Sequence, residues 1–175
     1  TLVDYDIKNC FPLFLCLYWK DFGFDLDLTT TQFFQLAISG KVYEYIVKQG
    51  LSDTRDDAKV LVNKWLNCQL WYNNGELNAV HEAFGKLFPD VDNQIRKIKG
   101  FYYQELVGNI LRKKEYEFMY KKVAPALMNK GHKIIMMHDG VMVDSVHAED
   151  IISECIKEEF GMELPIKSKI IKYSE

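Results

Sequence analysis

The sequence lacks the features that mark several protein classes. Its longest apolar run, Phe11 to Trp19, is too short to cross a membrane and is followed by the charged Lys20 and Asp21. The four cysteines show no CxxC spacing and stand mostly among apolar residues, so we expect free thiols in a reducing compartment rather than disulfides or a zinc site. A basic leader, an internal repeat and a low-complexity tract are also missing. We therefore expect a cytoplasmic protein without a membrane partner.

A strong excess of charge of either sign is missing as well. The net charge of -3 and the pI near 5.8 lack the overall positive charge of a protein that coats DNA. Any contact with nucleic acid would need a local basic surface. Lys113, Lys114, Lys121 and Lys122 form such a stretch, which either follows a template backbone or is an ordinary solvated helix face.

The composition that is present favours a single folded unit. A chain of 175 residues with 48% hydrophobic content can bury one sizeable core. It begins at Thr1 in the middle of an apparent strand and without a methionine, so we expect part of a longer protein to precede it.

Apolar spacing predicts an α+β fold that is helix-rich around a small antiparallel sheet. Residues 1–7 have the pattern of a buried strand, and two apolar runs at 133–138 and 140–144 predict a hairpin, followed by a helix at 148–160 and a strand at 167–172. Helical spacing covers most of the rest: 11–19, 32–36 after caps at 29–31, 42–48, a helix from Ser52 or Asp53 to about Leu70, 76–87, 90–109 and 111–128. Gly40, Gly50 and Gly131 should end helices, 73–75 should turn, and Pro125 should kink the last long helix.

Two aspartates stand at strand ends in this pattern. Asp6 ends the first strand, and Asp139 lies inside the hairpin. Magnesium binds through a few carboxylates together with substrate oxygens, so two aspartates from adjacent strands would be sufficient for phosphoryl transfer. The alternative is that Asp139 belongs to a simple turn and Asp6 caps a helix.

Two cations stand one helical turn apart between these acids. Arg55 and Lys59 share a face near a helix N-terminus, where a triphosphate would be favoured, although a solvated face paired with Asp56 and Asp57 is the alternative. His138 either contacts a primer end or is a hydrogen-bonded core residue. Three aromatic residues, Trp65, Trp71 and Tyr72, are candidates for stacking on nucleic-acid bases. For Trp65 the alternative is core packing, which its helical spacing favours.

These segments, in this order, resemble the palm and fingers of family A DNA polymerases of the phage type. Leu2-Val3-Asp4-Tyr5-Asp6 with the following Ile7-Lys8-Asn9-Cys10-Phe11 is similar to motif A, and Arg55-Asp56-Asp57-Ala58-Lys59 is similar to the start of motif B. Met137-His138-Asp139 resembles motif C, and Gly40-Lys41-Val42-Tyr43 resembles the segment upstream of motif B.

The resemblance implies a polymerase palm at residues 1–38 and 101–175 and reduced helical fingers at 39–100, with any thumb or exonuclease domain preceding Thr1. It implies transfer of nucleotides from dNTPs to a primer 3′ end on a DNA template, with two Mg²⁺ ions, or Mn²⁺ instead, and with replication proteins as further partners. The cell would be bacterial or phage-infected. The implied roles are catalysis for Asp6, Asp139 and Lys59; nucleotide binding for Arg55, Lys59, Tyr43, Phe11 and Ile7; the primer end for His138; and metal binding for Asp6, Asp139 and Ile7.

The chain also departs from the family pattern. Phe11 replaces a glutamate, and its ring would exclude a ribose 2′-hydroxyl, which favours deoxynucleotides. Gly140 replaces the glutamate after the motif C aspartate, and related single-subunit RNA polymerases have serine there. Motif B lacks its tyrosine and glycines, whose positions are taken by Asn63, Lys64, Asn67 and Cys68. Two alternatives therefore stay open: an RNA-synthesising or primase-like relative, and a catalytically inactive module that binds nucleic acid.

Overall fold

The computed structural model describes residues 2–67, 75–101, 107–137 and 140–171, and these form an α+β fold as predicted. Its residues divide into two compact units. One, the sheet unit, joins residues 1–10 to 113–175, and the other, the helical unit, comprises residues 11–112. The assignment of palm and fingers to particular residue ranges stays a prediction.

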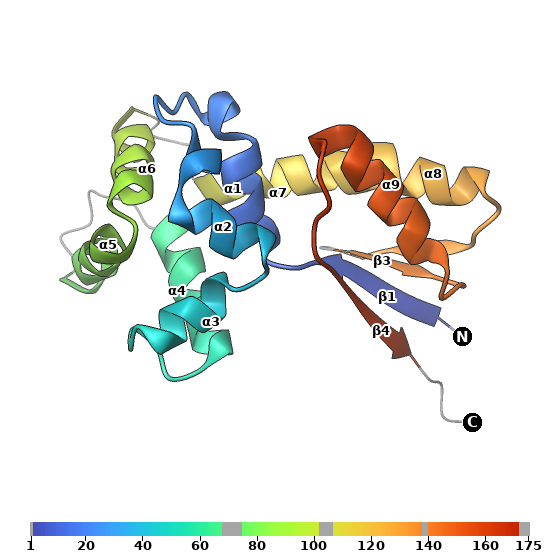
Figure 1. Cartoon of the computed structure of the whole chain (residues 1–175), viewed down its shortest axis with the longest axis horizontal. Coiled ribbons are helices and arrows are strands. Elements are labelled where there is room, and N and C mark those ends of the chain that lie inside the picture. The colour runs from blue at the N-terminus through green and yellow to red at the C-terminus, as the bar shows by residue number, and fades with distance from the viewer. Residues whose placement is uncertain (1, 68–74, 102–106, 138–139, 172–175) are drawn as a thin grey trace. The chain divides into compact units, whose positions relative to one another are not determined.

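The sheet unit contains four antiparallel strands in the order β2-β3-β1-β4 (Figure 1). They are β1 (Leu2–Ile7), β2 (Ile134–Met136), β3 (Gly140–Val143) and β4 (Ile166–Ile171). The predicted hairpin is present as the β2-β3 pair, and the predicted first and last strands pair with each other. The small antiparallel sheet is therefore confirmed, with β1 and β3 as its two inner strands.

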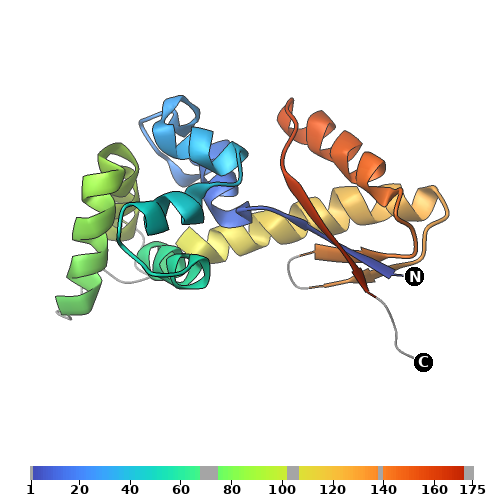
Figure 2. The same ribbon diagram turned by 60° about the horizontal axis from the view of Figure 1, so that its bottom comes forward.

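The two faces of the sheet differ in burial. Val3, Tyr5 and Ile7 are buried, whereas Asp4 and Asp6 alternate with them and are only half-buried. Helices α8 (Ala124–Asn129) and α9 (Ala148–Phe160) lie together on one side of the sheet (Figures 1 and 2) and contact each other and the strands. Because strand side chains alternate between faces, the apolar residues pack under the helices and the two aspartates project from the other face.

The helix that leads into α8 has a wider turn before its proline. Helix α7 (Val107–Phe118) continues through a π-helical turn, η3 (Met119–Val123), into α8. Pro125 lies in the first turn of α8 and has no N–H to donate to a preceding carbonyl, and an i→i+5 turn accommodates its ring. The predicted disturbance at Pro125 thus takes the form of a π turn. Gly131, with a φ of +85°, ends this helix as expected.

The helical unit is built from six α-helices within the described residues. They are α1 (Cys10–Leu17), α2 (Gln32–Ile38), α3 (Val42–Lys48), α4 (Arg55–Asn67), α5 (Gly75–Leu87) and α6 (Pro89–Phe101), with short 3₁₀ turns η1 (Trp19–Phe22) and η2 (Leu28–Thr30). Gly40 and Gly50 follow helices α2 and α3 with positive φ, as predicted. Residues 68–74 and 102–106, where the end of one predicted helix, part of another and most of a predicted turn fall, lie outside the described part. The predicted break between helices at 109–111 is wrong, because α7 begins at Val107 and continues through these residues.

The first turn of α4 corrects one expectation. Thr54, and not Ser52 or Asp53, caps this helix, because the Asp57 backbone N–H donates to Thr54 Oγ1 at 3.1 Å. The Thr54 hydroxyl in turn donates to Asp57 Oδ2 at 2.6 Å. This reciprocal pair is a variant of the capping box and fixes where α4 begins. Thr31 caps α2 in the same way, as predicted.

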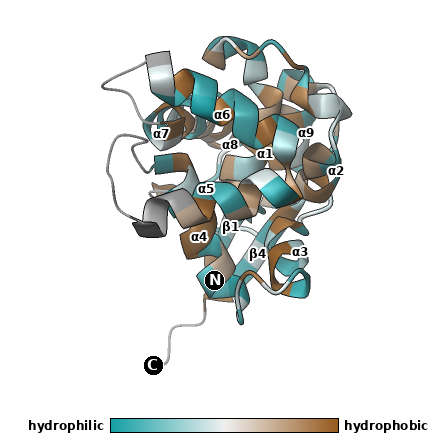
Figure 3. Ribbon diagram, turned by 90° about the vertical axis from the view of Figure 1, so that its left-hand side faces the viewer, coloured by the Kyte–Doolittle hydropathy of each residue, from teal (hydrophilic) through white to brown (hydrophobic). Residues whose placement is uncertain are grey.

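A buried polar cluster links α4, α5 and α6, which are amphipathic helices that mix hydrophobic and hydrophilic residues along their length (Figure 3). Asp92 accepts hydrogen bonds from Trp65 Nε1 at 2.7 Å, from Arg96 Nε at 2.6 Å and, at 2.6 Å, from His81 Nδ1 when that nitrogen carries the proton. Lys99 donates to the Trp65 carbonyl and lies 3.3 Å from His81 Nε2. Every carboxylate oxygen of Asp92 is therefore bonded although the side chain is buried.

Trp65 belongs to the core of this unit. It is fully buried and stacks on Phe84, with ring centroids 4.3 Å apart and an interplanar angle of 8°. Its indole N–H is bonded to Asp92. Of the two functions open for Trp65, core packing is therefore the one that the structure shows. Trp71 and Tyr72 lie outside the described residues.

Candidate functional site

Asp6 lies between two neighbouring strands near the end of β1. It is paired with Gly140 on β3 and with Lys167 on β4. Directly opposed residues in antiparallel strands place their side chains on the same face, with Cβ atoms about 5 Å apart. Asp139 and His138 lie outside the described residues, but Asp139 is the sequence neighbour of Gly140. The register therefore places Gly140, the residue after Asp139 in the sequence, opposite Asp6.

Gly140 has a structural reason to be glycine. A Cβ atom at this position would lie 2.5 Å from the carbonyl oxygen of Tyr5, a distance that side chains do not tolerate. Glycine is therefore required at position 140, where the resemblance to motif C predicts glutamate, because β3 lies very close to β1 there. The same Cβ position is 3.7 Å from Asp4 Oδ1, so the Asp4 carboxylate lies next to Gly140.

Two lysines share the face that carries the aspartates. Lys167 is opposite Asp6 and Lys169 is opposite Asp4, and both lysines are exposed. Nothing in the sequence alone pointed to them, because the strand register decides which residues of β1 and β4 meet. The face therefore carries both carboxylates and ammonium groups.

The donor chemistry of this face suits a hard cation. Carboxylate oxygens are ligands that Mg²⁺ prefers, and Asp6 is half-buried rather than shielded by the core. Within the described residues there is no cluster of three or more His, Cys, Asp or Glu side chains of metal-binding geometry, and Asp139 falls outside them. Ile7 is 4% exposed, so any contribution from this residue to a metal or nucleotide must come from its main chain.

Asn9, two residues after β1, has an unusual environment. Its side chain is 4% exposed, and both its Nδ2 and Oδ1 atoms have no hydrogen-bond partner in the described part of the chain. Its backbone has a φ of +52°, in the left-handed region that asparagine tolerates better than most residues. Such a side chain costs free energy, and orphaned buried groups of this kind gather at functional sites. Phe11, the predicted sugar-selecting residue, is half-buried in the first turn of α1.

Of the predicted phosphate-binding residues of the helical unit, Arg55 lies against Tyr43. The Arg55 guanidinium lies over the Tyr43 ring, 5.0 Å from its centroid, and Tyr43 is 6% exposed. Arg55 Nε also donates to Glu44 Oε1 at 2.9 Å. Lys59 is exposed one helical turn after Arg55. The structure thus brings Tyr43 and Arg55 together, and gives Arg55 an ion pair with Glu44 rather than with Asp56 or Asp57.

The two sets of predicted residues occur in different units. Asp6 and Ile7 belong to the sheet unit, whereas Tyr43, Arg55 and Lys59 belong to the helical unit, as does Phe11. The predicted metal ligands and the predicted triphosphate ligands therefore belong to separate units.

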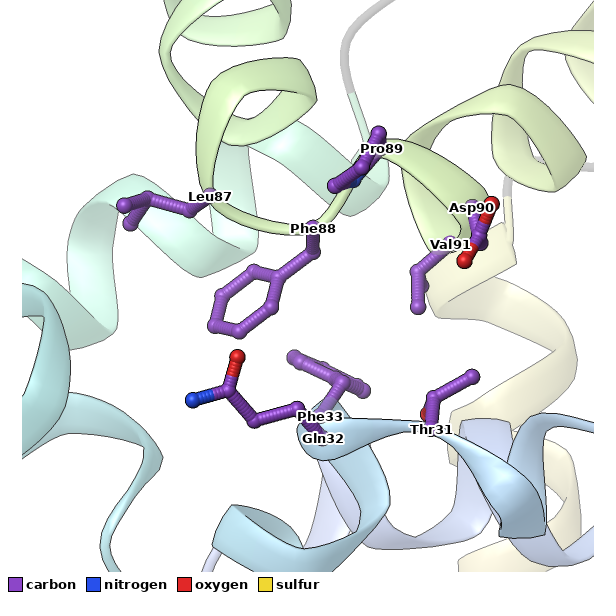
Figure 4. Close-up of a pocket in the computed structure, with 8 residues that line it drawn as sticks. All are labelled: Thr31, Gln32, Phe33, Leu87, Phe88, Pro89, Asp90 and Val91. Carbon is purple, nitrogen blue, oxygen red and sulfur yellow. The ribbon is translucent and has the colours of Figure 1, made fainter.

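A small pocket of the helical unit does not contain these residues. It has a volume of about 130 Å³, and Figure 4 shows the Phe33 and Phe88 side chains converging on it beside Gln32. A wider concavity of about 780 Å³ is bordered by the Lys97–Asp25 ion pair, 2.6 Å long. Cys16 is fully buried, and burial raises the pKa of its thiol, which is typical of a core residue rather than a nucleophile.

Comparisons with protein-family models, curated proteins and solved structures found no match to this chain. None of the described helices combines the length and apolar character needed to cross a membrane. Any function must therefore be argued from the residues and geometry of the chain itself.

Proposed function

We propose that this chain is a reduced family A-like DNA polymerase core, which adds nucleotides from dNTPs to a primer 3′ end as directed by a template. One observation carries the proposal. The β1-β3 register sets Asp6 against Gly140, the neighbour of Asp139, and the face that Asp6 shares with Asp4 is the one that α8 and α9 leave uncovered. Two carboxylates from adjacent strands are the donor set that the reaction requires.

In this proposal Asp6 and Asp139 hold two Mg²⁺ ions, or Mn²⁺ ions in their place, with the main chain of Ile7 beside them. When bound, the ions neutralise charge on the attacking oxygen and on the phosphates. His138, next to Asp139 in the sequence, contacts the primer end.

Arg55 and Lys59 bind the triphosphate in this proposal. The buried Tyr43 ring lies beneath the guanidinium and restricts its orientation, so Tyr43 acts through Arg55 as a positioning residue. Lys59 neutralises or protonates the departing pyrophosphate. Glu44, which now bonds Arg55 Nε, has to share or release that group when a triphosphate binds.

Extension of a primed DNA template by the full chain in Mg²⁺, with dNTPs compared to rNTPs, tests this function. We expect extension with dNTPs, and we expect Phe11→Ala to raise the use of rNTPs because the ring no longer meets the 2′-hydroxyl. Phe22→Ala, which removes a buried ring elsewhere in the helical unit, controls for loss of packing. Extension with rNTPs alone would favour the RNA-synthesising alternative, and a chain that extends with neither would be a nucleic-acid-binding module at most.

A further inference from the structure

Two tyrosines form an exposed stack on the long helix of the sheet unit. Tyr116 is 53% exposed and Tyr120 is 39% exposed. Among the described residues, no other Phe, Tyr or Trp side chain is as exposed. Their ring centroids are 4.2 Å apart and the rings are inclined by 27°. The pair stands where α7 passes into the π turn, one helical turn apart.

The core does not use this stack. On the other side of the same helix Glu115, Phe118 and Val123 are buried, and Phe118 packs against Phe160 of α9 at 5.2 Å between centroids. The buried side thus faces α9, and the two tyrosines project from the exposed side. Exposed apolar rings held together in this way need an explanation other than folding.

Lysines lie on both sides of the stack. Lys113 is exposed one helical turn before Tyr116, and Lys121 is exposed just after Tyr120. Lys121 pairs with Glu117 at 3.3 Å, whereas Lys122 pairs at 3.3 Å with Glu159 of α9, on the other side of the helix from Tyr120. A single ion pair near the surface is weak, so a phosphate can replace Glu117 as the partner of Lys121. Cations therefore flank an aromatic platform at both ends.

We propose that Tyr116 and Tyr120, with Lys113 and Lys121, form a binding site for single-stranded nucleic acid. Bases stack on the outward faces of the two rings, and phosphates contact the lysines. A duplex keeps its bases stacked inside, so it cannot use the rings, and an apolar protein partner would not need the flanking cations. The site requires neither metal nor triphosphate, and the inference therefore goes beyond the proposed polymerase activity.

Fluorescence anisotropy with a labelled oligo-dT of about 20 nucleotides and a duplex of the same length tests this site, because only the single strand offers bases to the two rings. Without metal, the double variant Tyr116→Ala/Tyr120→Ala should weaken binding of the single strand by about 10-fold or more and leave binding of the duplex within about 2-fold of the original chain. Tyr116→Phe/Tyr120→Phe, which keeps both rings, should bind within about 2-fold of the original chain, and Lys113→Gln should lower the salt dependence.

Two further variants serve as controls. Met128→Ala removes an exposed apolar side chain further along the same helix and should leave binding unchanged. Asp53→Asn, at an exposed position in the helical unit, should also bind the oligonucleotide normally. The proposal is overturned if the alanine pair binds the single strand as well as the original chain does, if it loses duplex binding to the same degree, or if the original chain does not bind the single strand. Loss of self-association in the alanine pair, with oligonucleotide binding retained, would assign the stack to a protein contact instead.

Discussion

Single residues show where stability and function conflict in this chain. Asn9 combines a left-handed backbone with a buried side chain whose two polar atoms lack partners in the described structure. An unsatisfied buried polar group costs roughly 1–3 kcal/mol. No pattern of apolar spacing predicts such a residue, because the signal lies in how a turn buries one side chain.

Asn9→Gly should therefore stabilise the fold by about 1 kcal/mol, since glycine accepts the positive φ and removes the orphaned amide, while its greater unfolded-state freedom offsets part of the gain. Urea unfolding measures this change. Asn93→Gly, at an exposed position in α6, should instead lower stability by a few tenths of a kcal/mol. A large loss of stability in Asn9→Gly would mean that the amide makes a contact that stabilises the native state.

Arg55 forms an ion pair with Glu44. Glu44 holds its Nε at 2.9 Å, and both side chains are about half exposed, so their ion pair adds little to stability. Glu44→Gln should leave the unfolding midpoint nearly unchanged and should increase the affinity for dNTP by about 2- to 5-fold, because it removes a competitor for the guanidinium. Titration of the chain with dNTP measures this. Glu82→Gln, at an exposed position in α5, is the matched control, and weaker binding by Glu44→Gln would contradict the competition.

At the scale of elements, the periodicity of the sequence predicted the hairpin, the first and last strands and most helices, but it placed a helix break at 109–111, inside α7. It could not predict the register between β1, β3 and β4, which decides that Lys167 meets Asp6 and that Gly140 is forced against Tyr5. It also could not place the Asp92 cluster, because that cluster joins three helices through side chains far apart in the sequence. Local rules thus predicted the elements, and long-range pairing determined how the candidate site is assembled.

The Asp92 cluster gives a prediction for α4, α5 and α6 together. Burial alone would raise the pKa of Asp92, but hydrogen bonds from His81, Arg96 and Trp65 outweigh it and hold this pKa below its ordinary value. The carboxylate therefore stabilises the fold above the unfolded-state pKa of about 4, and this contribution is lost as the pH falls through the lower folded-state value. Urea unfolding between pH 7 and pH 3 should show the loss.

Asp92→Ala should lower stability at pH 7 by about 3–5 kcal/mol, because it leaves the buried cationic and polar partners uncompensated. The same variant should show a weaker decline in stability on acidification than the original chain. Asp90→Ala, an exposed neighbour in the first turn of α6, should change stability by about 0.5 kcal/mol or less. Equal effects of the two variants would show that the cluster contributes little.

At the scale of the whole molecule, the chain leaves the sheet unit after Cys10 and returns to it at Lys113, so the helical unit is an insertion within the sheet unit. Composition predicted a single folded unit, whereas the chain divides into two compact units, and composition alone carries no information on such a division. The predicted metal ligands fall in the sheet unit and the predicted triphosphate ligands in the helical unit. Catalysis in our proposal therefore needs the complete chain.

Binding of metal to the folded chain should raise its stability. At a Mg²⁺ concentration of 100 times the dissociation constant we expect a gain of about 2.7 kcal/mol, seen as a higher unfolding temperature. Asp6→Asn should remove this gain, whereas Asp53→Asn, at an exposed position in the helical unit, should keep it. An equal response in the two variants would place the metal elsewhere.

The measurement that tests the central claim most directly is the rate of primer extension by Asp6→Asn and Asp139→Asn in Mg²⁺ and dNTPs, compared with Asp53→Asn. Both carboxylate variants should fold, and each should lose activity by on the order of 100-fold or more, because metal neutralisation contributes several kcal/mol to the transition state. The Asp53→Asn control should extend the primer at the original rate. Undiminished extension by either carboxylate variant would contradict the proposal that Asp6 and Asp139 together form a polymerase metal site.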